Sequence, residues 1–174
     1  LALTQDGSVY AFGYNGQGQL GDGTTNQRTK PVRVVKGAYS GTNYLGDDAD
    51  NPIMAIAAGD LHSLALAADG TIYSFGYNSN GALGNGTYTT GATTIPQRVQ
   101  DGNNYPGTTY LGDNPRNPVV KIAAGWRYSM ALTLDGSVYT FGFNGYGQLG
   151  INTSNSGVYS TPNRVQDGAY LGTA

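Results

Sequence analysis

One stretch decides the fold of this chain: Asp69-Gly70-Thr71-Ile72-Tyr73-Ser74-Phe75-Gly76-Tyr77-Asn78. It occurs three times, because closely similar stretches start at Asp6 and at Asp135. A long period of this kind is typical of an array of one supersecondary unit. We therefore expect residues that recur in every copy to serve the architecture, and we look for binding residues where the copies differ.

The composition favours strands and tight turns over helices. Of the 174 residues 28 are Gly, 14 are Tyr and only 11% are charged, and every acidic residue is Asp. Glu and Lys are strong helix formers, whereas Asp favours turns and caps, so we expect an all-β chain. The net charge of −2 gives no electrostatic footprint for nucleic acid, and no apolar run approaches the roughly 18 residues of a membrane helix. The absence of Cys excludes a disulfide framework, a Cys-ligated zinc site and a cysteine nucleophile.

The middle copy predicts four strands. Apolar runs at 63–68 and 71–76 flank Asp69-Gly70, which is a strong hairpin signal. Another apolar run at 54–59 precedes the hairpin, and a segment that begins with Pro follows it at 96–100. The inner strands carry apolar or small residues on both faces, so each sheet must be covered on both sides. Radial stacking of four-stranded antiparallel sheets meets this requirement, and we predict a β-propeller with one blade per repeat.

The combined motif resembles the repeat of the regulator of chromosome condensation family. The matching segments are Ile56-Ala57-Ala58-Gly59, His62-Ser63-Leu64-Ala65-Leu66, Asp69-Gly70, Tyr73-x-Phe75-Gly76-x-Asn78 and Gly81-x-Leu83-Gly84. The resemblance covers essentially the whole chain, and it implies a propeller of about seven blades, of which this chain holds about three. We expect residues 1–174 to form a single propeller segment with repeat units at approximately 1–52, 53–118 and 119–174. The segment is then either a fragment of a ring or one share of a ring built from several chains.

The first unit starts out of step with the other two. Residues 1–4 align with 64–67, so the strand that corresponds to 54–59 is missing from the first unit. We therefore expect a first blade that the chain cannot complete to four strands by itself.

Departures from the family pattern suggest a subgroup. The usual Trp-Gly is Phe-Gly in every unit, and Tyr-Leu insertions occur at 37–46 and 105–112, with a stub at 168–172. Such insertions resemble bacterial surface members of the family, and the low charge favours a location outside the cell or on its surface. The tyrosines that recur in the insertions, Tyr44, Tyr110 and Tyr170, are expected to pack on the blade rim.

No constellation of catalytic residues is expected. His62 is the only histidine, and Asp60 and Ser63 lie too near it along one strand to converge on a reacting atom, so we expect a structural role inside the blade. The segment Gly16–Gly21 fits a dinucleotide fingerprint, but no amphipathic helix follows to receive a pyrophosphate. We expect no cofactor and no enzymatic activity. The repeat residues expected to be structural are Phe12, Phe75, Phe141, Leu20, Leu83, Leu149 and His62.

One acidic cluster is a weak metal candidate. Asp47, Asp48 and Asp50 are the densest set of oxygen ligands in the chain, and calcium prefers such ligands. The alternative is a plain solvated loop.

Three aromatic residues are candidates for binding. Tyr88, Tyr105 and Trp126 do not recur between the units, and such side chains offer rigid contact area with a polar tip.

The sequence predicts a non-catalytic scaffold for protein or glycan interaction, as part of a larger bacterial extracellular or cell-surface protein. The expected partner is a protein or a carbohydrate, with further propeller repeats and other copies of the chain as alternatives, and without nucleic acid or membrane insertion. The family resemblance also implies a second interpretation, a regulatory propeller that acts as a guanine-nucleotide exchange factor or as a protein inhibitor of an enzyme.

Overall fold

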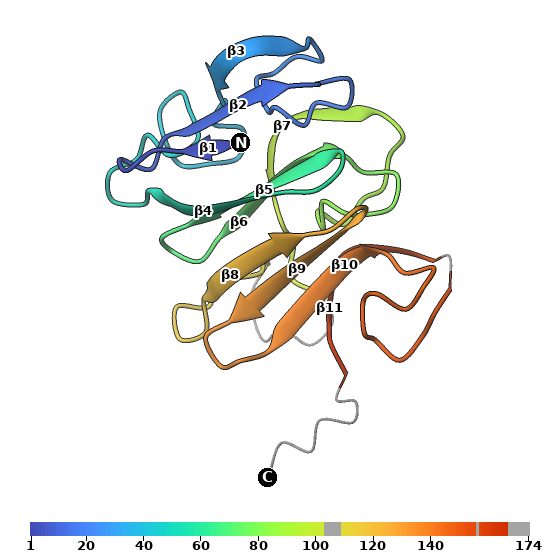
Figure 1. The fold of residues 1–174 in the computed structure, drawn as a ribbon. Coiled ribbons are helices and arrows are strands. Elements are labelled where there is room, and N and C mark those ends of the chain that lie inside the picture. The colour runs from blue at the N-terminus through green and yellow to red at the C-terminus, as the bar shows by residue number, and fades with distance from the viewer. Residues whose placement is uncertain (103–108, 156, 167–174) are drawn as a thin grey trace.

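The computed structural model describes residues 1–102, 109–155 and 157–166 (Figure 1). All regular elements in these residues are β-strands, and they include no helix with the length and apolar character needed to cross a membrane. Three antiparallel sheets have the orders β1-β2-β3, β4-β5-β6-β7 and β8-β9-β10-β11. The strands are β1 (Ala2–Leu3), β2 (Val9–Gly13), β3 (Arg28–Arg33), β4 (Ile53–Ala58), β5 (His62–Ala67), β6 (Ile72–Tyr77), β7 (Ala92–Arg98), β8 (Val119–Ala124), β9 (Tyr128–Thr133), β10 (Val138–Phe143) and β11 (Val158–Arg164).

The Asp-Gly turns form the predicted hairpins. Asp69 and Gly70 connect β5 to β6, and the Asp69 side chain accepts a hydrogen bond of 2.8 Å from the backbone N–H of Thr71. Gly70 has φ = +90°, a conformation that is costly for residues with a side chain. The turns at Asp6 and Asp135 make the same bond, at 3.1 and 2.9 Å. Each hairpin is therefore closed by the residues that first marked the repeat.

The three sheets follow one another as a stack of blades, with the β1–β3 sheet and the β8–β11 sheet at its two ends (Figure 1). Two apolar clusters lie between consecutive sheets, one between the first and second blades and one between the second and third. All six residues of β5, in the middle blade, are buried, which agrees with a sheet covered on both faces. In β9, at the end of the stack, buried and half-buried residues alternate, because only one face has a neighbouring blade. Strand β8 also contacts both β4 and β5, so consecutive blades are packed together along their inner strands.

The first blade has three strands and the other two have four. Strand β1 pairs with β2 as β5 pairs with β6, and among the described residues the first sheet contains no counterpart of β4 or β8. In the described part of the chain the first blade therefore has three strands, as expected from the alignment of residues 1–4 with 64–67.

The two recurring tyrosines that the structure describes, Tyr44 and Tyr110, pack against the blade rim as predicted. Tyr44 and Tyr110 form isolated bridges with Val35 and Gln100. The guanidinium of Arg33 lies 4.5 Å from the Tyr44 ring centre, and that of Arg98 lies 4.0 Å from the Tyr110 ring centre. The leucines that follow the two tyrosines, Leu45 and Leu111, are fully buried. Tyr170 lies outside the described residues.

The structural repeat positions are buried with one exception. Leu20, Leu83 and Leu149 are buried, and Phe75 and Phe141 have no exposed surface, but Phe12 is 51% exposed. Phe12 was expected to be a structural repeat residue like the other two, but unlike them it is not part of the core. Phe75 packs on Gly21 of the preceding blade so closely that a Cβ at Gly21 would lie 2.8 Å from its ring, and Phe141 packs in the same way on Gly84. Phe12 is in the first blade of the stack and has no such neighbour.

Candidate interaction surface

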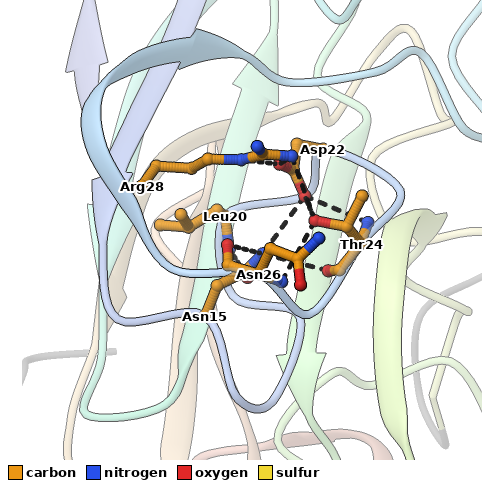
Figure 2. Close-up of polar contacts among 6 residues, drawn as sticks. All are labelled: Asn15, Leu20, Asp22, Thr24, Asn26 and Arg28. Carbon is orange, nitrogen blue, oxygen red and sulfur yellow. Dashed lines mark hydrogen bonds and ion pairs between the residues drawn. The ribbon is translucent and has the colours of Figure 1, made fainter.

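A buried asparagine organises the loop that follows the second strand of each hairpin. In the first blade, the Asn15 side-chain oxygen accepts a hydrogen bond of 2.9 Å from Leu20 N–H (Figure 2). Its amide nitrogen lies 3.0–3.1 Å from Thr24 O, Asn26 O and an Asp22 carboxylate oxygen. Asn15 is completely buried and cannot bond to water, so these contacts satisfy the hydrogen-bonding groups of its amide.

The Asp22 side chain also holds this loop (Figure 2). It accepts hydrogen bonds from Arg28 Nε at 2.6 Å and from the Thr24 hydroxyl at 2.7 Å. Burial raises the pKa of Asp22, but the bonds from Thr24 and Arg28 outweigh this effect, and the pKa lies below its ordinary value. The charges of Asp22 and Arg28 are thus used to hold the loop.

The other two blades repeat the contacts of the buried asparagine. Asn78 bonds to Leu83 N–H at 3.1 Å and to Thr87 O at 3.0 Å, and Asn144 bonds to Leu149 N–H at 3.0 Å. The glycine-rich segment 16–21 is therefore a turn that seats Leu20 in the core, and it is followed by strand β3 rather than by a helix. The structure offers no helix N-terminus at this segment for a dinucleotide.

His62 joins the second and third blades. It is 2% exposed, and its Nε2 lies 2.9 Å from the Ser129 hydroxyl, which itself donates to Ala82 O at 2.8 Å. Because the Ser129 proton is used on Ala82, the geometry requires that His62 Nε2 carries a proton and donates. The expected structural role fits this geometry, but the bond reaches the next blade instead of staying inside its own.

Burial keeps the imidazole neutral. Burial lowers the pKa of His62 to about 4, although the Asp60 charge acts in the opposite direction. Asp60, His62 and Ser63 all line a cavity of about 220 Å³ between the first two blades. The Ser63 hydroxyl donates to Gln19 O at 2.8 Å, so it is not hydrogen-bonded to His62 as a nucleophile would be.

The carboxylates of Asp47 and Asp48 accept hydrogen bonds from groups of their own loop. Asp47 accepts hydrogen bonds of 2.8–3.1 Å from the hydroxyl and N–H of Thr42 and from the N–H groups of Asn43 and Tyr44. Burial opposes ionisation of Asp47, but these bonds outweigh it and lower its pKa to about 2. Asp48 accepts hydrogen bonds from Ser40 and from the backbone of Asp50. In the described ranges no three metal-ligating side chains gather at one point, and the structure does not bring Asp47, Asp48 and Asp50 together as a ligand set.

An exposed aromatic cluster lies on the third blade. Trp126 occupies the β8–β9 turn, and its ring meets the Phe143 ring edge to face, with ring centres 6.2 Å apart. Phe143 meets Tyr146 in the same way at 5.9 Å. The Arg127 guanidinium lies 4.1 Å from the Trp126 ring centre, and Phe143 N–H donates to Arg127 O at 2.9 Å. Trp126 is 52% exposed and Tyr146 is 85% exposed, so the cluster presents its rings to the outside.

The structure places two of the three predicted aromatic candidates, in different loops. Trp126 lies in the cluster, Tyr88 is 65% exposed in the loop between β6 and β7, and Tyr105 lies outside the described residues. Sequence reasoning missed the cluster members Phe143 and Tyr146. A signal for Tyr146 was present, because the first two units have Gln17 and Asn80 at this position.

Comparison with known proteins identifies the repeat. The sequence model described as "Regulator of chromosome condensation (RCC1) repeat" matches residues 6–66, 69–132 and 135–169, and a second model with the same description matches 54–82 and 119–148. Each of the three matches of the first model begins at an Asp-Gly turn, so the first two run from the second strand of one hairpin to the first strand of the next.

Similar proteins include "Protein RCC2 homolog" of Danio rerio, which is 37% identical over 88% of this chain, and "Protein RCC2" of Homo sapiens, which is 31% identical over 88%. The aligned regions make up 26% and 24% of those two proteins, so this chain spans about a quarter of their length.

Among solved structures, yeast RCC1 (Prp20) bound to Kap60 superposes with a TM-score of 0.74. It is 26% identical, and the match covers 97% of this chain and 35% of that one. A second structure of Prp20p from Saccharomyces cerevisiae gives a TM-score of 0.71. The fold is thus that of part of an RCC1-type propeller, and the chain belongs to the regulator of chromosome condensation (RCC1) repeat family.

Proposed function

We propose that this propeller segment is a non-catalytic scaffold for contact with a protein partner, and that the cluster of Trp126, Arg127, Phe143 and Tyr146 is its contact surface. The observation that carries this proposal is the packing of two exposed rings, Trp126 and Tyr146, on the half-buried ring of Phe143, because contiguous exposed patches of large side chains mark interaction sites. The other polar groups considered above have internal tasks: Asn15, Asp47 and His62 each hold a loop or an interface between blades.

The chemistry of the cluster favours a protein over a glycan. Trp, Tyr and Arg are the residue types that dominate binding energy at protein interfaces. The contacts of Phe143 with Trp126 and Tyr146 hold the rings before any partner arrives, so little conformational entropy is lost on binding. The similar structures also favour protein partners, since the yeast protein is described as bound to Kap60 and as binding Gsp1p and histones. A glycan partner remains the alternative.

A regulatory role is the second candidate, because a solved relative is described by its binding to Gsp1p. In that case the segment acts as part of a guanine-nucleotide exchange factor or an inhibitor of an enzyme. Accelerated release of a fluorescent guanine nucleotide from a small GTPase, or stoichiometric loss of an enzyme's activity on titration, distinguishes this role from a passive scaffold.

We also propose a location outside the cell or on its surface and a bacterial source, which rest on the low charge and on the Tyr-Leu insertions.

Trp126 provides a direct test because it is the only tryptophan in the chain. The purified chain is titrated with Gsp1p, with core histones and with a panel of neutral oligosaccharides, while Trp126 emission and binding heat are recorded. We expect a protein probe to change the emission, and Trp126→Ala and Tyr146→Ala to weaken its binding at least about tenfold. The matched control is Tyr88→Ala, which removes an exposed aromatic ring outside the cluster.

Binding of a protein with no change in emission and no loss in the two variants would show that the contact surface is elsewhere. Binding of an oligosaccharide in place of a protein, with loss in the same variants, would keep the surface and replace the partner.

A further inference from the structure

The exposure of Trp126 and Arg127 belongs to the turn between β8 and β9 and does not depend on an uncovered blade face. The corresponding turn of the middle blade, between β4 and β5, holds Asp60 and Leu61. That blade has a neighbour on each side, yet Asp60 is exposed and Leu61 is half-buried, in the same way as Trp126 and Arg127. A side chain at this turn therefore faces the outside even where both faces of the sheet are covered.

The third blade reverses the charge of this turn. The middle blade has the carboxylate of Asp60 followed by the apolar Leu61, whereas the third blade has the ring of Trp126 followed by the guanidinium of Arg127. Residues that hold a repeat together recur from unit to unit, and this pair does not. The pair of Trp126 and Arg127 is therefore a candidate for recognition rather than for architecture.

Arg127 has no anionic partner among the residues that the structure describes. The ion pairs in this part of the chain join Arg28 to Asp22 and Arg98 to Asp113. The Arg127 guanidinium instead lies 4.1 Å from the centre of the Trp126 ring, and its Nε is buried without a hydrogen-bond partner. A positive charge is thus partly withdrawn from water without a counter-charge, and this favours the approach of an anionic group.

The surroundings of Arg127 suit a carboxylate that stands next to an apolar group. The Trp126 ring packs edge to face on Phe143 and restricts the guanidinium that lies on it, so little side-chain entropy is lost on binding. A guanidinium carries its N–H donors in one plane and can bind a carboxylate through two of them. An apolar side chain on the exposed indole of Trp126 would keep water away from this bond and strengthen it.

We propose that the cluster binds an acidic segment of its protein partner, with an Asp or Glu carboxylate on Arg127 and a neighbouring apolar side chain on Trp126. This inference rests on the function proposed above and names the chemistry of the partner. The net charge of the chain is −2, so the molecule as a whole does not attract an acidic segment. Binding of such a segment therefore depends on the local contact with Arg127.

A peptide selection tests this class of partner. A phage-displayed library of random dodecapeptides is selected on the purified 174-residue chain, and the enriched peptides are sequenced. We expect them to share an Asp or Glu beside an aromatic or aliphatic residue. A synthetic copy of the most enriched peptide is then titrated into the chain while Trp126 emission and binding heat are recorded. Replacing its acidic residue by the corresponding amide should weaken binding at least about tenfold.

Variants of Arg127 assign the effect to one side chain. Arg127→Leu introduces the residue that the middle blade has at this position, and it should weaken binding of the peptide at least about tenfold. Arg127→Lys keeps the charge but not the planar donors, and it should retain part of the affinity. The matched control is Arg116→Leu, which removes an exposed arginine from the loop between β7 and β8 and should leave the affinity unchanged. Circular dichroism checks that each variant is folded.

The outcomes separate this inference from the proposed function. Enriched peptides that lack acidic residues, or that bind Arg127→Leu as well as the unmodified chain, overturn the inference. If those peptides still lose affinity for Trp126→Ala, the cluster is a contact surface and the proposed function stands. Peptides that bind Trp126→Ala and Arg127→Leu without loss, or a selection that enriches no peptide, count against both.

Discussion

Replacing Phe75 with Ala should reveal how strongly consecutive blades hold each other. Phe75 has no exposed surface and lies against Gly21, whose turn is fixed by the bond between Asn15 and Leu20. Burial of a phenylalanine side chain stabilises a fold by about 1.5–3 kcal/mol, and the cavity left by truncation raises the usual loss to about 3–5 kcal/mol. Gly21 has no side chain that could move into the space, so we expect a loss near 4 kcal/mol for Phe75→Ala.

Phe12→Ala is the matched comparison. Phe12 has the same place in the repeat, but it is 51% exposed and its removal leaves no enclosed cavity. Phe12→Ala therefore removes about half of the burial energy and creates no cavity, so we expect the free energy of unfolding to fall by about 1 kcal/mol or less. The two substitutions are chemically identical, and the difference between them isolates the contact between blades.

The assay is urea unfolding followed by circular dichroism at low protein concentration, with thermal melts as a second measure. For a chain of this size, about 1 kcal/mol corresponds to roughly 2–4 °C in Tm, so Phe75→Ala should lower the Tm by roughly 8–16 °C. Equal losses for Phe12→Ala and Phe75→Ala, or a loss below about 1 kcal/mol for Phe75→Ala, would refute the reasoning that burial by the preceding blade decides the contribution of this residue.

Three further outcomes are expected. His62 has its pKa lowered to about 4 from an ordinary value of 6.5, so the folded state resists protonation and stability should fall as pH drops from about 6.5 to 4, by about 3 kcal/mol at pH 4. In urea titrations across this range, His62→Gln should remove most of that slope, and an unchanged slope would contradict the assignment. Chelation of calcium should leave the melting curve unchanged, because the Asp47 oxygens are occupied by N–H and O–H donors of its own loop, whereas a lower Tm after chelation would restore the metal hypothesis. Asn78→Ala leaves Leu83 N–H buried without its partner and should cost about 1–3 kcal/mol in urea unfolding, while Asn80→Ala, at a partly exposed position of the same loop, serves as the control.

Local features were predictable because their causes lie within a few residues. The Asp-Gly turns depend on a side chain bonded two residues along the chain and on a glycine with positive φ, and both were visible in the sequence. The covering of both sheet faces followed from strands that are apolar on both sides, as in β5. The missing strand of the first blade followed from the alignment of residues 1–4 with 64–67. The Tyr-Leu insertions were recognisable as rim packing because Tyr44 and Tyr110 recur.

Features that depend on contacts between segments distant in the sequence were not predictable in this way. His62 and Ser129 are 67 positions apart, and no local periodicity indicates that they meet. The cluster of Trp126, Phe143 and Tyr146 forms because the β8–β9 turn and the loop after β10 reach the same end of one blade, which requires the sheet to be in place.

The sequence by itself therefore determined the repeat, the all-β class, the hairpins and their turns, because strand pattern and turn chemistry act between near neighbours. Only the tertiary structure decided which side chains are covered. Phe12 and Phe75 stand in nearly identical local sequences, yet one is half exposed and the other is completely buried. The physical reason is that burial of a blade face depends on whether another blade lies against it, and the residues of that blade are remote in the sequence.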